Sequence, residues 1–229
     1  MTGGHATGST GHAFDDAGLG ALRRGALDVA PLLLNAVVAT EVDGERVAVR
    51  LTEVEAYEGA RDPGSHGYRG RTARNSALFG PPGTLYVYFT YGMHFCANIV
   101  CGGDGVASAV LMRGGEVVEG RAVAAARRRS PARERDLANG PAKLAQALGL
   151  DRRHDGAVLG TAAATPGTAA ATLGGVAARP PAGMMRGPRV GVSGPGGGDA
   201  YAWRFWLPGE ETVSRYRAAV ARPPRGAAK

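Results

Sequence analysis

The segment at residues 47–57 reads Val-Ala-Val-Arg-Leu-Thr-Glu-Val-Glu-Ala-Tyr, and its β-branched and apolar side chains indicate a strand that enters a core. An apolar run at 37–40 precedes it, and the Asp43-Gly44 pair between the two runs is a strong hairpin signal. The sequence therefore predicts strand, turn and strand over 37–57. In the second strand, alternation places Glu53, Glu55 and Tyr57 on one face.

The rest of the chain continues this mixture of short strands and helices. β-Branched and aromatic residues predict further strands at 84–91, 106–112, 189–192 and 202–207. Helical composition is found in a segment that ends near Asp28 and again at 116–135 and 137–148. Glycine and proline make 58–83 loop-like. We expect an α+β fold: a single domain with a curved, mostly antiparallel sheet and surrounding short helices.

Composition also suggests where the domain begins and ends. Residues 1–15 are rich in Gly, Ser, Thr and His without periodicity, which is typical of a disordered tail. The domain is expected over 16–218, followed by a frayed basic tail at 219–229. Within the domain, the Ala/Gly-rich segment 151–187 is interpreted as a surface insertion and not as a second domain.

Charge and cysteine content restrict the class of protein. The chain of 229 residues carries a formal net charge of +7, which favours a polyanionic partner. It has no apolar run near the ~18 residues of a membrane span, and its N-terminus lacks the pattern of a signal peptide. A cytoplasmic protein with no membrane partner is expected. Cys96 and Cys101 lack the spacing of a zinc site, so they are expected to be free thiols, and no metal site is predicted.

The face that carries Glu53 and Glu55 is followed by an unusual set of side chains. An isolated Glu-x-Glu pair on a strand usually lies on a solvated edge. Here the next forty residues add a histidine, several arginines and three tyrosines: His66, Arg69, Arg71, Arg74, Tyr86, Tyr88 and Tyr91. So many functional side-chain types so close together point to a site.

Several motifs of the chain resemble the alkyladenine (3-methyladenine) DNA glycosylase family. They begin with Glu-Val-Glu-Ala-Tyr at 53–57 and the long segment Gly-Thr-Leu-Tyr-Val-Tyr-Phe-Thr-Tyr-Gly-Met at 83–93, followed by Phe-Cys-Ala-Asn at 95–98. Further matches are Leu-Met-Arg at 111–113, Gly-Pro-Ala-Lys-Leu at 140–144 and Pro-Arg-Val-Gly-Val at 188–192. They occur in the order of the family over roughly residues 20–215.

The resemblance implies a role for each matching residue. Glu55 resembles the general base that activates the attacking water, which Arg113 and the backbone of Val190 help to hold. Three aromatic residues, Tyr57, His66 and Tyr88, resemble the walls of the base pocket. Asn98 resembles the residue that collides with the exocyclic amine of guanine and so excludes this base. Tyr91 and Met93 are the expected DNA contacts, and Tyr91 resembles the side chain that wedges into the duplex.

These roles imply a monofunctional DNA N-glycosylase of base-excision repair. It would flip alkylated purines of the 3-methyladenine type out of double-stranded DNA and hydrolyse the N-glycosidic bond, leaving an abasic site. The resemblance implies no cofactor, and a monomer in the bacterial cytoplasm, associated with the nucleoid, is expected. Flipping costs a few kcal/mol, and an aromatic cage favours a cationic alkylated base by ~0.5–2 kcal/mol per cation–π contact.

Two other functions remain open at this point. Glu53 and Glu55 would lie ~7 Å apart on a strand, near the separation of an inverting glycoside hydrolase. Alternatively, the tyrosines could stack on DNA bases in a binding module without turnover. Lys143 could in principle form a Schiff base, but it is interpreted as a structural residue. The Arg127–Arg129 cluster is interpreted as a solvated helix face or as a phosphate contact. The preferred lesion, any general acid and the role of 151–187 stay open.

Overall fold

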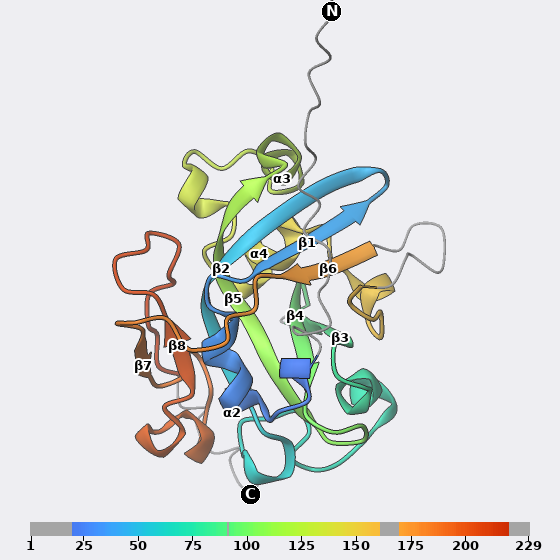
Figure 1. Ribbon diagram of the computed structural model, residues 1–229, viewed down its shortest axis with the longest axis vertical. Helices are drawn as coiled ribbons and strands as arrows, with labels where there is room; N and C mark the ends of the chain where they lie inside the picture. Colours follow the sequence, from blue (N-terminus) through green and yellow to red (C-terminus); the bar gives the residue numbers. More distant parts are fainter. Residues whose placement is uncertain (1–19, 91, 161–169, 220–229) are drawn as a thin grey trace, which may run out of the picture.

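The chain builds one α+β domain around an open antiparallel sheet (Figure 1). The computed structural model describes residues 20–90, 92–160 and 170–219. The strands are β1 (Val37–Val42), β2 (Glu45–Tyr57), β3 (Leu85–Thr90), β4 (His94–Cys101), β5 (Ser108–Glu119), β6 (Ala170–Gly174), β7 (Met185–Gly187) and β8 (Arg204–Trp206). The tail expected at 1–15, and all of the basic tail except residue 219, lie outside the described residues.

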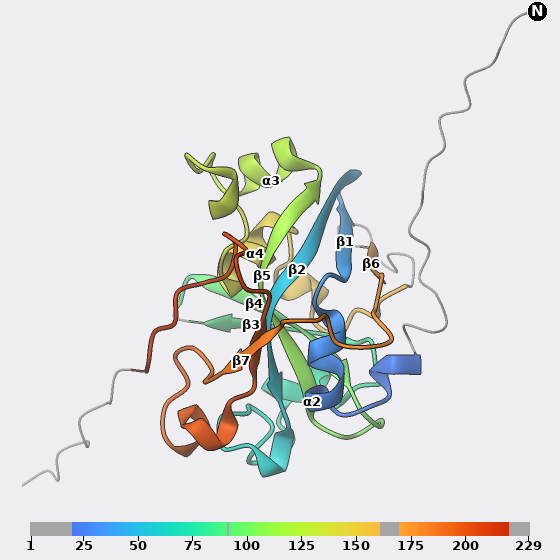
Figure 2. The same ribbon diagram turned by 60° about the vertical axis from the view of Figure 1, so that its left-hand side comes forward.

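Strand β2 is the centre of the sheet. The strand order is β3-β4-β5-β2-β1-β6, and β8 pairs with β2 and with β7. The hairpin between β1 and β2 is confirmed: Val42 pairs with Glu45, and both Asp43 and Gly44 have positive φ, as a two-residue type I′ turn requires. The first half of β2 pairs with β1 and the second half with β8. On its other side, β5 follows β2 along most of its length (Figure 2).

The pairing of β2 with β5 is irregular where the two glutamates lie. The register shifts between Leu51 and Glu53 and again between Glu53 and Val54, opposite Arg113. Such bulges bend a strand and change the direction of nearby side chains, and they are common beside functional sites. Here they give Arg113 access to both Glu53 and Glu55.

Short helices cover the sheet and complete the core. The α-helices are α2 (Ala26–Val29), α3 (Arg121–Arg127) and α4 (Pro141–Ala147), and α4 packs against β4 and β5. The 3-10 helices are η1 (Ala30–Leu33), η2 (Gly59–Arg61), η3 (Ala73–Phe79), η4 (Glu134–Asp136), η5 (Arg152–His154), η6 (Pro195–Gly197) and η7 (Asp199–Tyr201). Fully buried Leu33, Leu51, Met112, Leu144 and Leu148 belong to the main core cluster. No helix in the described ranges is long and apolar enough to cross a membrane.

Several elements differ from the sequence prediction. Residues 116–119 continue β5, because pairing with β2 outweighs their helical composition, and the helix starts only after Gly120, whose φ is +72°. The helix expected at 137–148 is restricted to α4. No strand forms at 189–192, because the Val190 amide donates to a side chain instead of to a neighbouring strand.

Part of the segment 151–187, for which the sequence predicts a surface insertion, joins the sheet. Strand β6 pairs with β1 in antiparallel register, and its Leu173 is buried in the core together with Leu159. The Ala-Ala-Thr-Leu-Gly sequence of β6 has little strand character of its own. It forms a strand because β1 offers an unpaired edge. Residues 161–169 lie outside the described ranges.

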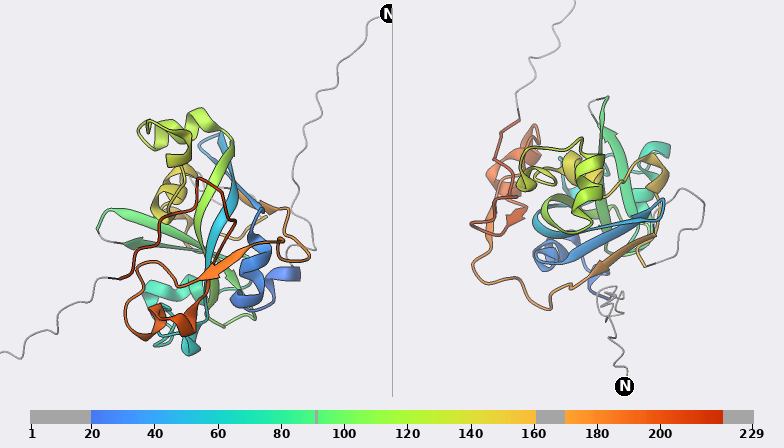
Figure 3. Two further views of the ribbon diagram at one scale, coloured as in Figure 1. Left: turned by 90° about the vertical axis from the view of Figure 1, so that its left-hand side faces the viewer. Right: turned by 90° about the horizontal axis from the view of Figure 1, so that it is seen from above.

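The β3–β4 hairpin projects from the body of the molecule, as the left view of Figure 3 shows. Thr90 pairs with His94 at its end. Met93, in the turn, is 68% exposed. The hairpin therefore presents its turn away from the core.

Candidate active site

A cavity of ≈330 Å³ opens beside the C-terminal half of β2, among β3, β4, β5 and the loops at 63–66 and 190–193. This volume lies at the small end of the range of ligand pockets, about 300–1,000 Å³. Six residues that the sequence assigns to the site line it: Tyr57, His66, Tyr88, Asn98, Arg113 and Val190. Glu55 lies fully buried beside them and is bonded to three of the six.

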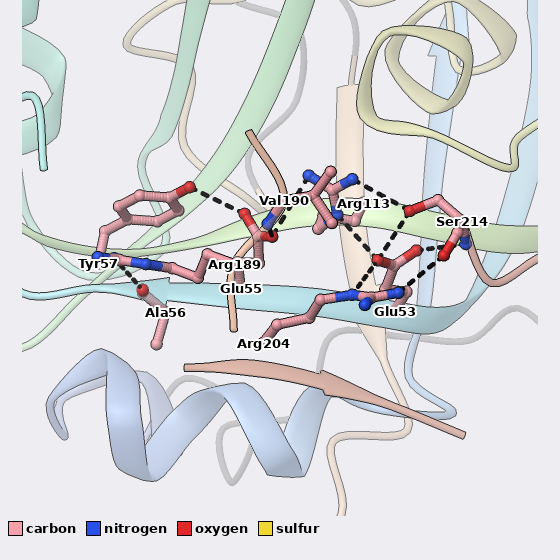
Figure 4. A network of polar contacts seen from close by, with 9 residues as sticks. All are labelled: Glu53, Glu55, Ala56, Tyr57, Arg113, Arg189, Val190, Arg204 and Ser214. Atoms are coloured by element: carbon pink, nitrogen blue, oxygen red, sulfur yellow. Dashed lines mark hydrogen bonds and ion pairs between the residues drawn. The ribbon is translucent and has the colours of Figure 1, made fainter. Parts of the chain in front are cut away.

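The carboxylate of Glu55 is held at both oxygens (Figure 4). The backbone N–H of Val190 donates to Oε1 at 2.7 Å, and the hydroxyl of Tyr57 donates to Oε2 at 2.8 Å. Nη1 of Arg113 lies 3.4 Å from Oε1. Burial, and then the charge of Glu55, raises the pKa of Tyr57 well above its ordinary value, so the phenol keeps its proton and donates. The carboxylate itself does not line the cavity, and it is held directly behind the wall by three residues that do.

Glu53 has a different environment, although it lies only two residues earlier. It accepts hydrogen bonds from Nε of Arg113 at 2.9 Å, from Nε of Arg204 at 2.6 Å, and from the backbone and hydroxyl of Ser214 at 2.7 and 2.9 Å. It is fully buried and does not line the cavity. Arg113 therefore pairs with both glutamates, and Glu53 anchors the guanidinium that faces Glu55.

An aromatic wall stands across the cavity. Tyr86 and Tyr88 project from the same face of β3, as an i, i+2 pair must, with ring centroids 5.4 Å apart. The ring of His66 meets Tyr88 edge-on at 4.5 Å, and its Nδ1 lies 2.9 Å from the Tyr86 hydroxyl. Burial, and then Asp155, raises the pKa of Tyr86 to about 12. The phenol therefore keeps its proton, and its hydroxyl shares a hydrogen bond with Nδ1 of His66. Tyr86, to which the family resemblance gives no role, lines the cavity and supports its wall directly.

The His66 imidazole is kept neutral by its surroundings. Burial, and secondarily the charge of Arg74, lowers its pKa below the ordinary value. A neutral ring can stack on a cationic base, whereas a protonated ring would repel it. Asn98 completes this wall: its Nδ2 donates to the Tyr86 carbonyl at 3.0 Å, which fixes the orientation of the amide.

Replacing Arg74 with glutamine is expected to raise the pKa of His66, because it removes a positive charge that disfavours protonation of the ring. An NMR titration of the imidazole C–H resonances measures this directly. Arg71→Gln, on the same loop, is the matched control, since Arg71 is not among the groups that shift His66. An unchanged His66 pKa in Arg74→Gln would contradict the electrostatic account of this wall.

The structure does not bring every predicted residue to the cavity. Met93 lies in the turn between β3 and β4 and does not line the cavity. Tyr91 falls outside the described residues. Both cysteines are buried free thiols, as expected, and Cys96 borders the cavity.

Sequence reasoning missed Asp62 and Arg189, which form a buried ion pair beneath the site. Asp62 belongs to an Asp-Pro-Gly turn signal, and Arg189 directly precedes Val190 in a motif noted for its backbone. An arginine in that position looks like one of many surface cations. Its burial depends on the tertiary structure.

In the ranges that the structure describes, no group of three or more His, Cys, Asp and Glu side chains is arranged to hold a metal ion. The groups that the site offers for chemistry are the carboxylate of Glu55, the guanidinium of Arg113 and the aromatic wall.

The site combines a buried carboxylate with an aromatic cavity on a basic α+β domain, an arrangement that suits an enzyme acting on a flat ring. Comparison with known proteins identifies the family. The family model for methylpurine-DNA glycosylase matches residues 21–211, and the chain belongs to this family. It is a DNA glycosylase of alkylated-base repair.

Individual relatives match over most of their length, and each bears the name "Putative 3-methyladenine DNA glycosylase". A protein of Streptomyces avermitilis is 52% identical over 202 residues, which cover 88% of this chain and 92% of the relative. A protein of Leifsonia xyli subsp. xyli is 50% identical over 207 residues, which cover 83% of this chain and 88% of the relative. A protein of Burkholderia lata is 48% identical over 191 residues, which cover 83% of this chain and 87% of the relative.

Proposed function

We propose that this glycosylase flips alkylated purines of the 3-methyladenine type out of duplex DNA and hydrolyses the N-glycosidic bond with Glu55 as general base. The observation that carries the proposal is the fully buried Glu55 carboxylate, fixed by Val190 and Tyr57 beside a cavity with aromatic walls. The names of the relatives support the choice of lesion.

The reaction needs only one carboxylate, because an alkylated cationic purine is already a good leaving group. Glu55 takes a proton from water as the water oxygen bonds to C1′ of the sugar. The bond from C1′ to the purine nitrogen breaks, and its electron pair stays on the base and neutralises the positive charge. Arg113 and the Val190 backbone, both at Glu55 Oε1, hold the carboxylate and the water in place. The negative charge of Glu55 also stabilises oxocarbenium character at the sugar.

The cavity is suited to a flat, positively charged base. Tyr57, His66 and Tyr88 line it, and the raised pKa values of Tyr57 and Tyr88 keep both phenols neutral. For Tyr88, burial is the main cause, followed by Cys96. Electron-rich rings without a positive charge of their own attract a cationic purine. Asn98, held on the wall by its bond to Tyr86, is proposed to reject the exocyclic amine of guanine.

A second cavity supports binding to a DNA backbone. It has ≈610 Å³, shares Arg113 and Val190 with the first, and is rich in cations. The other cations that line it are Arg133, Arg135, Lys143, Arg215 and Arg217. By contrast, Arg127 and Arg128 donate to backbone carbonyls of the domain, which favours a structural role for that part of the cluster.

The glycoside hydrolase alternative lacks its second carboxylate. Both carboxylate oxygens of Glu53 are occupied by Arg113, Arg204 and Ser214, none of which leaves it free to act on a substrate. A binding module without turnover would have no need for a buried carboxylate at Glu55, because burying such a group costs free energy. Neither alternative accounts for the site as well as base excision does.

A duplex oligonucleotide with one alkylated purine tests the proposal. We expect an alkali-labile abasic site and an unbroken strand before alkali treatment, because no amine of the described residues is placed in the cavity. Nζ of Lys143, the candidate for a Schiff base, instead donates to Asn139 at 2.7 Å. A protein–DNA adduct trapped by borohydride would overturn the monofunctional assignment.

Substitutions of Tyr91 and Tyr88 are expected to differ in whether their effect on excision requires a duplex substrate. If Tyr91 fills the gap left by the flipped base, Tyr91→Ser should weaken lesion-duplex binding by ~1–3 kcal/mol, the value of one base–aromatic stack. Excision from single strands should suffer much less. Tyr88→Ser should impair both substrates, because it removes a wall of the cavity. Parallel kinetics on duplex and single-stranded lesions measure the difference, and equal losses for Tyr91→Ser would contradict the wedge.

A further inference from the structure

The ion pair of Arg189 and Asp62 has no part in the chemistry described so far, yet it is among the most buried polar contacts of the molecule. Both side chains are fully buried, and the two nitrogen–oxygen pairs are each 2.6 Å apart. Burying two charges is expensive unless further hydrogen bonds satisfy them. The arrangement of these additional bonds shows what the pair holds together.

Arg189 connects β2 to the loop that carries Val190. Its Nη1 donates to the carbonyl of Ala56, the residue directly after Glu55, at 3.0 Å. Its Nη2 donates to the carbonyl of Gly196, on the far side of the same loop, at 2.7 Å. The guanidinium carbon lies 4.4 Å from the centroid of the Tyr57 ring, and the hydroxyl of this tyrosine donates to Glu55 (Figure 4).

Asp62 extends the connection to a third wall of the cavity. Its Oδ1 accepts from the backbone of Gly64 at 2.9 Å, and its Oδ2 accepts from the backbone of Glu58 at 3.2 Å. Gly64 borders the cavity, as do the next two residues, Ser65 and His66. A Cβ at Gly64 would lie 2.6 Å from Nη2 of Arg189. The close approach of loop and guanidinium therefore explains the glycine.

We propose that the Arg189–Asp62 pair is a positioning element that presents the Val190 N–H to Oε1 of Glu55. The pair fixes three parts of the site relative to one another: the end of β2, the loop at 62–66 and the loop at 190–193. Because Val190 directly follows Arg189, a shift of the guanidinium moves the amide that holds the carboxylate. The inference rests on the proposed role of Glu55 as the base.

The geometry requires arginine specifically. The two terminal nitrogens of Arg189 donate four hydrogen bonds in fixed directions. Two go to the carboxylate of Asp62, one to the carbonyl of Ala56 and one to the carbonyl of Gly196. A planar guanidinium can form this set, whereas the ammonium group of lysine is a compact point charge without the fork. The pair should therefore control the rate of bond cleavage more than the affinity for DNA, since Arg189 does not line the cavity.

Arg189→Lys and Asp62→Asn test the proposal with three measurements on the whole chain. These are the single-turnover rate on a duplex with one alkylated purine, the Kd for that duplex, and the NMR shift of the Val190 amide proton. We expect the rate to fall about 10²-fold, the loss typical of a misplacement of about 1 Å. The Kd should stay within about threefold, and the Val190 amide proton should move upfield as its bond to the carboxylate weakens.

Arg186→Lys is the matched control. Arg186 lies on β7, is exposed, and donates to a backbone carbonyl, that of Ala202, without contacting the site. All three measurements should stay at the parent values. If Arg189→Lys does not fold, Asp62→Asn, which keeps the shape of the side chain and removes the charge that faces Arg189, is expected to give the same pattern.

The outcomes separate this inference from the proposed function. A folded Arg189→Lys with the parent rate and an unmoved Val190 amide would overturn the positioning role. So would equal losses in rate and affinity with the amide unmoved, because they would indicate general destabilisation. Failure of the base assignment instead appears as activity in Glu55→Gln, whereas the NMR shift of Val190 reports the positioning independently of turnover.

Discussion

Replacing Glu55 with glutamine is expected to abolish base release while leaving the binding of lesion duplex nearly intact. Glutamine has nearly the shape of glutamate, but it cannot accept the proton of the attacking water. General acid–base groups contribute about 10²–10⁴-fold to rate, so the loss should be at least of this order. Single-turnover kinetics on an alkylated duplex, with binding measured in parallel, give both quantities.

Glu119→Gln is the control for the loss of a carboxylate. Glu119 ends β5, is exposed, and pairs with Arg46 at the surface, away from the cavity. Its replacement should leave both rate and affinity unchanged. Turnover of Glu55→Gln within tenfold of the parent would contradict the assignment of Glu55 as general base.

Replacing Arg113 with methionine is expected to cause the largest loss of stability among single changes at the site. Arg113 is buried between Glu53 and Glu55, and without it both carboxylates lose a positively charged partner. Removing one partner of a buried ion pair costs about 3–5 kcal/mol. For a domain of this size that corresponds to a fall in Tm of roughly 10 °C. Urea and thermal unfolding followed by circular dichroism measure the change.

Arg50→Met provides the comparison on the same sheet. Arg50 also bridges two carboxylates, Glu116 and Glu210, but this network is partly exposed to solvent. Exposed pairs contribute only ~0–1 kcal/mol. If Arg113→Met were no less stable than Arg50→Met, the two buried glutamates would not depend on Arg113 for their charge balance.

Local patterns and the family resemblance were sufficient to predict the centre of the fold and several residues that line the cavity. The Asp43-Gly44 turn identified the hairpin, because few other conformations suit that pair. Alternation along β2 placed the glutamates and Tyr57, and the family resemblance singled out residues that the structure brings to one cavity. These features depend on short-range backbone geometry and on motifs that are compact in sequence.

The features that were missed depend on contacts between distant segments. Strand β6 exists because β1 offers it an edge, and the end of β5 is a strand because β2 pairs with it. Similarly, Arg189 and Asp62 are 127 residues apart, and no local pattern distinguishes them from surface charges. Tertiary pairing outweighed local propensity in each case.

The most direct test of base excision is the chromatographic detection of free base released from methylated duplex DNA by the purified chain. We predict that free 3-methyladenine appears with time, that unmodified guanine is not released, and that the DNA strands remain intact. Tight binding to the methylated duplex without any free base would contradict the account, and the cavity would then belong to a binding module.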